Sequence, residues 1–345
     1  MKRTSSSLEA WDNLPANTPI NSMSESVLIE ARNVTIDFIS ARLPAARAVD
    51  DVSFILRESE MLGLVGESGC GKTTLMLSLL RLLPSAGRIV DGQILFLGQD
   101  LFDLSEVEMQ DVRWKNISMI FQGAMNALNP VKSIGDQILE AIQRHYPGQT
   151  RTSATERVCA LLEMVGIDPS RRKQYPHQYS GGMRQRAMIA MALSCNPQVV
   201  IADEPTTALD VMVQAQILEL LDTLRHNLGL AVILVTHDLG VVAEICDTVL
   251  VMYGGVTAEY ADIDTIFNRP RHPYTSQLLA AFPDLSKPKD LLISIPGYPP
   301  RLDDLPPGCR FAPRCKLAFE RCELEKPALH QLDSFHQASC HLVEP

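Results

Sequence analysis

The chain has 345 residues, of which 46% are hydrophobic, and this is enough for one large folded domain with an appended segment. Its 31 Lys and Arg residues are outnumbered by 41 Asp and Glu residues, and the net charge of -10 argues against general attraction to nucleic acid or to an anionic membrane. No apolar stretch approaches the roughly 18 residues that span a bilayer, and the first residues lack the apolar core of a signal peptide, so we expect a cytoplasmic protein with reduced cysteines.

The elements predicted along the chain are those of an α/β protein. Residues 1–26 are rich in Ser, Asn and Pro and predict a mobile tail. The runs V-L-I-E-A-R-N-V-T-I-D-F and V-D-D-V-S-F-I-L predict two strands, and M-L-G-L-V leads through a glycine-rich turn into a Leu-rich helix. The sequence pattern of residues 123–195 predicts mainly helices. The apolar runs V-V-I-A-D and L-A-V-I-L-V-T are typical of strands that are buried on both faces. We therefore predict a parallel α/β core over residues 27–264, interrupted by a helical insertion, and a separate Pro-, Arg- and Cys-rich extension over residues 265–345.

The glycine-rich turn has the pattern of a phosphate-binding loop. The sequence G-E-S-G-C-G-K-T-T begins at Gly66 and matches G-x-x-x-x-G-K-[ST] between a strand and a helix. Its backbone amides would surround phosphate oxygens, Lys72 would hold the β- and γ-phosphates, Thr73 would bind Mg²⁺, and Thr74 could bond a neighbouring phosphate oxygen. The candidate ATP-binding residues here are Gly66, Ser68, Gly69, Cys70, Gly71, Lys72, Thr73 and Thr74.

A pair of carboxylates follows the later buried strand. Asp203 and Glu204 directly follow V-V-I-A, and α/β sheets place ligands at the carboxyl ends of their strands. We expect Asp203 to hold the Mg²⁺ shell and Glu204 to act on the attacking water. A phosphate loop and an acidic pair still leave kinases, GTPases and motor ATPases open.

The segment Y-S-G-G-M-R-Q-R, which begins at Tyr179, narrows this choice. It resembles the signature of the ABC proteins, which usually begins L-S-G-G-Q. The resemblance implies that Ser180, Gly181 and Gly182 complete the ATP site of a second subunit, in a head-to-tail dimer with two nucleotides between the partners. A simple phosphoryl-transferring kinase would not explain this motif.

The same resemblance assigns further residues. It implies that Gln122 in I-F-Q-G senses Mg²⁺ and water, that Asp210 in T-A-L-D acts across the dimer, and that His237 in V-T-H-D contacts the γ-phosphate. Phe38, an aromatic residue at the end of the first strand, is the candidate to stack on adenine, with a core position as the alternative. The implied fold is a P-loop (RecA-like) nucleotide-binding domain with an antiparallel β subdomain and a helical subdomain.

Several segments resemble the ATPases of dipeptide and oligopeptide importers. They are F-Q-G-A-M-N-A-L-N-P, L-L-E-M-V-G-I and R-H-P-Y-T-S-Q-L-L-A-A-F-P. This implies an ATPase on the cytoplasmic face of the inner membrane, with two permease subunits, a second and non-identical ATPase, and an extracytoplasmic solute-binding protein as partners. Sugars, metal chelates and opines are alternative cargoes, and a cytosolic ABC regulator or repair factor is the alternative function.

Four cysteines cluster in the extension with the spacing C-x5-C-x6-C-x17-C. They are Cys309, Cys315, Cys322 and Cys340. The spacing suits a zinc ribbon poorly, because ribbons favour C-x2-C pairs, and the importer resemblance implies a 4Fe-4S cluster. Zinc and no metal remain the alternatives, with His330, His336 and His341 as other candidate ligands. We expect each of the remaining cysteines to be a small, buried, hydrophobic residue.

Overall fold

The computed structural model describes residues 26–39, 44–123, 127–207, 209–281 and 295–344. The predicted tail therefore lies almost wholly outside the described residues. The chain forms two compact units. The inserted unit contains Leu104–Val232, and the split unit contains Val27–Asp103 together with Ile233–Pro345.

The split unit begins with a four-stranded antiparallel sheet in the order β2-β1-β4-β5. Ile36 of β1 is fully buried and lies opposite Val49 of β2 and Ile89 of β4, so the sheet has one apolar face. The strands are β1 (Val27–Phe38), β2 (Ala46–Arg57), β4 (Gly87–Phe96) and β5 (Gln99–Asp100). The predicted first two strands are thus present as an antiparallel pair.

The second sheet of the split unit carries the buried strands. β3 and β9 are parallel, and every residue of both is buried, as expected for strands covered on both faces. The antiparallel strand β10 follows β9 along the chain, and β8 lies on the other side of β3. These strands are β3 (Met61–Val65), β8 (Ala231–Thr236), β9 (Thr248–Tyr253) and β10 (Val256–Asp262). The helices of this unit up to the extension are α2 (Lys72–Leu79), α9 (Leu239–Ile245), α10 (Ile263–Asn268) and α11 (Pro273–Ala280).

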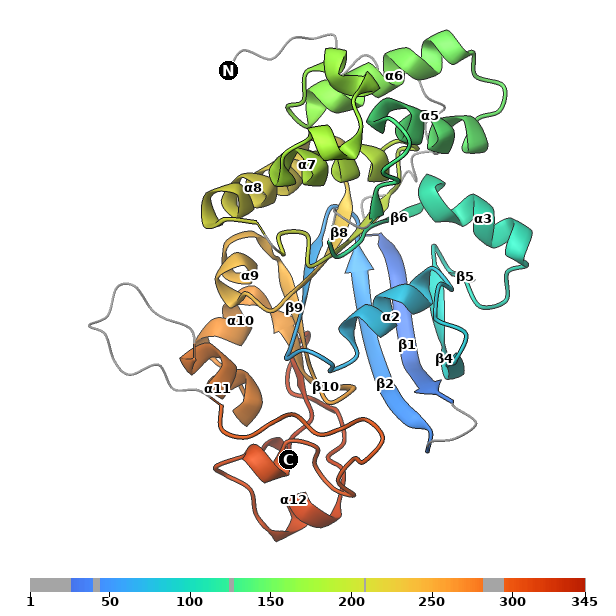
Figure 1. The fold of residues 1–345 in the computed structure, drawn as a ribbon. Coiled ribbons are helices and arrows are strands. Elements are labelled where there is room, and N and C mark those ends of the chain that lie inside the picture. The colour runs from blue at the N-terminus through green and yellow to red at the C-terminus, as the bar shows by residue number, and fades with distance from the viewer. Residues whose placement is uncertain (1–25, 40–43, 124–126, 208, 282–294, 345) are drawn as a thin grey trace. The chain divides into compact units, whose positions relative to one another are not determined.

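The extension is not structurally separate from the second sheet. β12 is antiparallel to β10, with Glu259 opposite Ala338, and β11 pairs with β12. The extension lies against the β10 side of the sheet in Figure 1, where it is drawn in red. Its small elements are η3 (Ala312–Arg314), α12 (Glu320–Leu324), β11 (His330–Gln331), β12 (Gln337–Ala338) and η4 (His341–Val343). A segment this short has little core of its own, so added strand pairing gives it a stable position.

The inserted unit is mainly helical, as the sequence predicts for residues 123–195. Its two parallel strands are accompanied by helices whose N-termini are capped by side chains, including Ser105, Ser133 and Thr150. In Figure 1, α5, α6 and α7 lie together at the end of this unit. Its elements are α3 (Glu106–Lys115), β6 (Ile117–Ile120), α5 (Ile134–His145), α6 (Arg151–Met164), η1 (Pro169–Lys173), η2 (Pro176–Gln178), α7 (Gly181–Ala192), β7 (Val199–Asp203) and α8 (Val211–Leu228).

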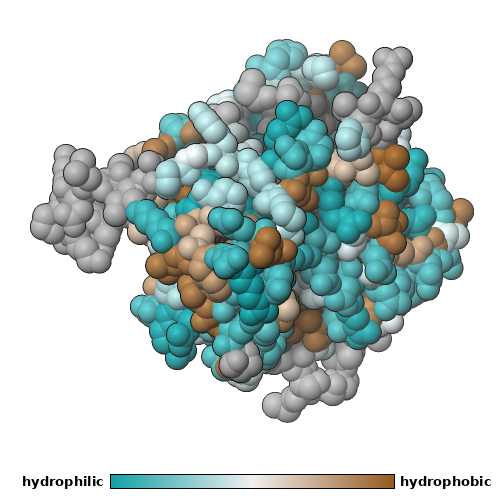
Figure 2. Space-filling view, turned by 90° about the horizontal axis from the view of Figure 1, so that it is seen from below, coloured by the Kyte–Doolittle hydropathy of each residue, from teal (hydrophilic) through white to brown (hydrophobic). Residues whose placement is uncertain are grey.

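The surface is predominantly polar on the side drawn in Figure 2, where apolar residues are scattered among hydrophilic ones. Among the described residues, the longest helix, α8, is amphipathic, and none of the helices has the length and apolar character that a bilayer crossing requires.

Candidate functional site

The phosphate-loop sequence lies in the split unit between β3 and α2. Gly66 and Gly71 have positive φ angles of 152° and 101°, in the region that favours glycine. A Cβ atom at Gly66 would lie 2.2 Å from the Met252 carbonyl oxygen, and one at Gly71 would lie 2.2 Å from that of Ala48. Only glycine fits these two positions, which lie against the backbone of β9 and β2.

Lys72 is the first residue of α2 and is buried inside the loop. Its ammonium group donates hydrogen bonds to the carbonyl oxygens of Gly66 at 2.7 Å and Glu67 at 3.0 Å. Burial raises the pKa of the Cys70 thiol despite the nearby Lys72 charge, which makes Cys70 an unreactive member of the loop. The other candidate residues of the loop are exposed or half-buried, namely Ser68, Gly69, Thr73 and Thr74.

Gln122 and Glu204 meet in the inserted unit. Gln122 follows β6 and Glu204 follows β7, and because these strands are parallel their carboxyl ends lie at one edge. Gln122 Nε2 donates a 2.7 Å hydrogen bond to Glu204 Oε2, and the Thr207 hydroxyl donates to the same oxygen at 2.9 Å. Sequence reasoning did not single out Thr207. Its position three residues after Glu204, within a turn, was the only available signal.

Glu204 has an unusual backbone. Its φ angle is 43°, in the left-handed region that side chains other than those of Gly, Asn and Asp seldom adopt. Asp203, which precedes it, is buried with 2% of its surface exposed. Strained positions of this kind concentrate at functional sites, and here the strain falls on the residue to which sequence reasoning assigns the chemistry.

The signature segment and Asp210 lie side by side in the inserted unit. The exposed Ser180 caps α7 and accepts a hydrogen bond from the Met183 amide, and Asp210 caps α8 in the same way. A Cβ atom at Gly182 would lie 2.7 Å from a methyl group of Val213 on α8, so any larger residue at this position would have to displace the Val213 side chain. A Cβ atom on the neighbouring Gly181 would lie 3.3 Å from Leu209.

Phe38 and His237 both belong to the split unit. Phe38 is the last residue of β1, half-buried, and paired in register with Ala46 and Gly87. His237 follows β8 and is exposed. The predicted ATP-site residues are thus divided between the two units. The phosphate loop, Phe38 and His237 lie in the split unit, whereas Gln122, Asp203 and Glu204 lie in the inserted unit.

Burial and neighbouring thiols raise the pKa of three cysteines of the extension, Cys309, Cys315 and Cys340. Burial, together with the nearby Cys309, Cys315 and Cys322 thiols, raises the pKa of the Cys340 thiol to about 11. The Cys309 amide donates a 2.7 Å hydrogen bond to the Cys322 carbonyl oxygen. Within the described ranges, however, no set of three His, Cys, Asp or Glu side chains is arranged to hold a metal ion.

Two of the histidines proposed as other ligands form hydrogen bonds with carboxylates. His336 Nε2 lies 2.8 Å from Glu259, and His341 Nδ1 lies 2.7 Å from Glu344. His330 Nε2 lies 3.7 Å from the same Glu344 carboxylate. The contacts of His336 and His341 disfavour these two residues as metal ligands, whereas His330 Nε2 makes no hydrogen bond among the described residues.

Sequence reasoning also missed an ion pair at the phosphate loop. Arg314 of the extension donates hydrogen bonds to both carboxylate oxygens of Glu67. The two residues lie 247 positions apart, so no spacing pattern joins them.

The folds and motifs of the two units define an ABC nucleotide-binding protein. The "ABC transporter" family model matches residues 49–207, and the "Oligopeptide/dipeptide transporter, C-terminal region" model matches residues 258–322. The ATP-binding cassette MJ0796, solved as a post-hydrolysis dimer bound to ADP and Pi, is 26% identical with a TM-score of 0.61, over 68% of this chain and 98% of that one. These matches confirm the predicted fold class and an ATPase.

Curated relatives match nearly the full length of the chain. The dipeptide transport ATP-binding protein DppD of Escherichia coli (strain K12) is 47% identical, covering 86% of this chain and 90% of the relative. The oligopeptide transport ATP-binding protein AppD of Bacillus subtilis (strain 168) is 45% identical, covering 92% and 98%. The chain therefore belongs to the family of ATP-binding subunits of peptide ABC transporters.

Proposed function

We propose that this chain powers the uptake of dipeptides, oligopeptides or related small solutes by an ABC importer. The observation that carries the proposal is the match of the extension to the C-terminal region of oligopeptide/dipeptide transporters, because the description of this model names a cargo class and that of the ABC transporter model does not. The relatives named for dipeptide and oligopeptide transport support the cargo class. The proposed location is the cytoplasmic face of the inner membrane, peripherally bound to two permease subunits.

The predicted residues of the split unit and of the inserted unit are proposed to have different roles in ATP binding and hydrolysis. The buried ammonium group of Lys72 and the loop amides would bind the phosphates, and Phe38 would stack on adenine. Mg²⁺ would be held by oxygens of Thr73, Gln122 and Asp203, because hydroxyl, amide and carboxylate oxygens suit this ion. When bound, this ion would neutralise phosphate charge.

Glu204 is proposed as the group that positions or deprotonates the attacking water. The hydrogen bonds from Gln122 and Thr207 both reach Oε2, and together they orient the carboxylate that would accept a hydrogen bond from water. His237 would contact the γ-phosphate. Hydrolysis would then proceed by in-line attack, with the positive groups of the site stabilising the developing charge.

A second ATPase subunit, which we expect to be a non-identical relative, would complete each site. Ser180, Gly181 and Gly182 lie at the N-terminus of α7, where amide groups favour an anion, and Asp210 lies beside them. In a head-to-tail dimer this surface would face the partner's nucleotide. ATP would favour the closed dimer and hydrolysis would reopen it. This two-state cycle would drive conformational change in the permeases.

The importer proposal is tested by co-expressing the chain with its genomic neighbours and purifying it from membranes. We expect recovery of permease subunits and, in proteoliposomes with the solute-binding protein, ATP turnover that peptides stimulate. Stimulation by sugars or metal chelates alone would contradict the cargo class. A chain recovered without permeases would contradict transport and favour the cytosolic regulator.

We further propose that Cys309, Cys315, Cys322 and Cys340 bind a 4Fe-4S cluster. Four thiolates are the usual ligand set of such a cluster. The Cys309, Cys315 and Cys322 thiols lie near enough to Cys340 to raise its pKa, and the backbones of Cys309 and Cys322 share a hydrogen bond. When bound, the cluster would join the parts of the extension covalently. The absence of a set of three side chains placed for a metal ion within the described ranges weighs against this proposal.

Chemical analysis after anaerobic purification tests the cluster. We expect roughly four iron and four acid-labile sulfide per chain, and their loss in Cys322→Ser but not in the control Cys159→Ser, which lies outside the extension on α6. Zinc without sulfide, or no metal at all, would contradict the proposal.

A further inference from the structure

The extension contacts the phosphate loop directly through Arg314, which lies on η3 immediately before Cys315. Arg314 Nη2 lies 2.9 Å from Glu67 Oε1, and Nη1 donates to Glu67 Oε2, so the pair is bidentate. The Arg314 side chain is 5% exposed and that of Glu67 is 26% exposed. The hydrogen bonds to Glu67 raise the pKa of the Arg314 guanidinium above its ordinary value.

Arg314 is itself held in one place. Its Nε donates a 2.8 Å hydrogen bond to the Pro296 carbonyl oxygen, and its Nη1 lies 3.1 Å from the Tyr253 hydroxyl. The Tyr253 ring packs against the rings of Tyr274 and Phe311, with centroids 4.6 and 5.1 Å away. The guanidinium thus extends from a cluster of β9, α11 and extension residues, which limits the positions that it can adopt.

Glu67 transmits this contact to the phosphate-binding lysine. The Glu67 amide donates a 3.0 Å hydrogen bond to the Tyr274 hydroxyl, and the Glu67 carbonyl oxygen accepts one from Lys72 Nζ, also at 3.0 Å. The amide, carbonyl and carboxylate groups of Glu67 are therefore all hydrogen-bonded. The amide and the carboxylate bond to residues outside the loop. A movement of Arg314 would shift the peptide that orients the lysine.

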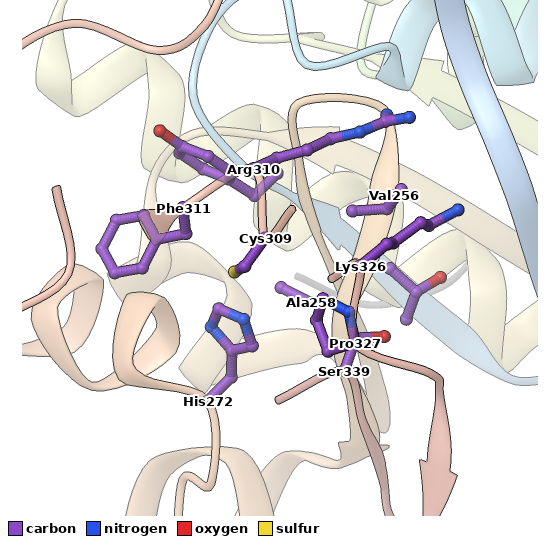
Figure 3. Close-up of a pocket in the computed structure, with 11 residues that line it drawn as sticks. Val256, Ala258, His272, Cys309, Arg310, Phe311, Lys326, Pro327 and Ser339 are labelled. Atoms are coloured by element: carbon purple, nitrogen blue, oxygen red, sulfur yellow. The ribbon is translucent and has the colours of Figure 1, made fainter. Parts of the chain in front are cut away.

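The extension makes a second connection to the loop through Arg310. This side chain donates to the Gly254 carbonyl oxygen and pairs with Asp50, which also binds Lys326 of the extension. Figure 3 shows Arg310 and Lys326 extending to the same side of a cavity of about 30 Å³, while Phe311 points the other way. Gly255, which follows Gly254 in the chain, donates a 3.0 Å hydrogen bond from its amide to the Cys70 carbonyl oxygen of the phosphate loop.

We propose that Arg314 is a positioning residue for nucleotide binding, through which the cysteine-bearing extension sets the affinity of the phosphate loop. The inference rests on ATP binding by this family and does not depend on the cargo. A merely structural ion pair would change the stability of the fold and leave the affinity for nucleotide unchanged.

The test is a steady-state comparison of KM and kcat for ATP in the full chain, purified with the partners that it recovers. We expect Arg314→Gln and the isosteric Glu67→Gln each to raise KM about tenfold, near the low end of measured couplings between sites, with kcat within about twofold of wild type. The double variant should have the same KM as either single variant, because all three variants lose the same ion pair. Arg314→Lys should be intermediate, since it keeps the charge and loses the bidentate geometry.

Arg301→Gln is the matched control, because this exposed arginine of the extension forms an ion pair with the nearby Asp303 and should keep the wild-type KM. Thermal unfolding without nucleotide separates folding from binding. An unchanged KM in the Glu67 variants, or additive effects in the double variant, would overturn the proposal. If Arg314→Gln does not fold, Glu67→Gln and Arg314→Lys still decide between the two outcomes.

Discussion

Asp50 illustrates how one residue joins segments that are distant in the sequence. Its carboxylate lies on β2 and accepts hydrogen bonds from Arg310 and Lys326 of the extension. Burial alone would raise the pKa of Asp50, but the Lys326 hydrogen bond and the charges of Arg310, Lys326 and Arg47 outweigh it and lower the pKa below 3.8. The ionised form is therefore favoured in the folded state.

Asp50→Asn should lower the free energy of unfolding by about 2 kcal/mol at pH 7, because it leaves the buried Arg310 without its counter-charge. A depressed folded-state pKa stabilises the fold above the unfolded-state pKa near 3.8, and this stability is lost as pH falls through the lower folded-state value. The difference between the two proteins should thus be constant above about pH 5 and shrink below pH 3.8.

Urea unfolding at a series of pH values measures this difference. Asp303→Asn provides the comparison, because it removes a carboxylate of the extension whose partner Arg301 is exposed, and it should cause little change. A difference for Asp50→Asn that grows as the pH falls would contradict the assignment.

At the scale of elements, buried Glu259 fastens the extension to β10. Its side chain is fully buried and accepts hydrogen bonds from the Arg271 and His272 amides, at 2.7 and 3.0 Å. His336 of the extension lies 2.8 Å away on the same carboxylate. One side chain thus joins β10, the start of α11 and the loop before β12.

Glu259→Gln should lower the free energy of unfolding by about 3 kcal/mol, because the amide NH₂ cannot accept the hydrogen bonds that the carboxylate accepts. Urea unfolding provides the value, and amide exchange should show weaker protection of the β10–β12 pair. Glu325→Gln, which changes an exposed carboxylate that follows α12 and pairs with Arg321, should have little effect. Equal stabilities of the Glu259 and Glu325 variants would rule out this anchoring role.

The elements that sequence reasoning predicted best were those with local signals. The apolar runs ending at Val65 and Asp203 are strands, and Gly66 and Gly71 have the backbone angles that a phosphate loop requires. The contact between Arg314 and Glu67 could not be predicted, because it depends on tertiary folding over 247 positions. For the same reason, the extension seemed separate from the core in the sequence although its strands continue the second sheet.

For the whole molecule, the central proposal is that this chain hydrolyses ATP with Glu204 as the group that acts on the attacking water. Glu204 lies in the inserted unit and Lys72 lies in the split unit, so neither unit has the full set of predicted residues. The net charge of -10 is in keeping with a protein that binds its nucleotide through one cationic loop rather than through a broad basic surface.

The most direct test of this claim is ATP turnover by Glu204→Gln beside ATP binding by the same variant. We predict a turnover at least roughly 100-fold below wild type with ATP affinity retained, because the amide keeps the shape of the side chain and loses the base. Glu219→Gln, at an exposed position on α8, should hydrolyse ATP like wild type. Turnover of Glu204→Gln within about tenfold of wild type would contradict the account and place the catalytic group elsewhere.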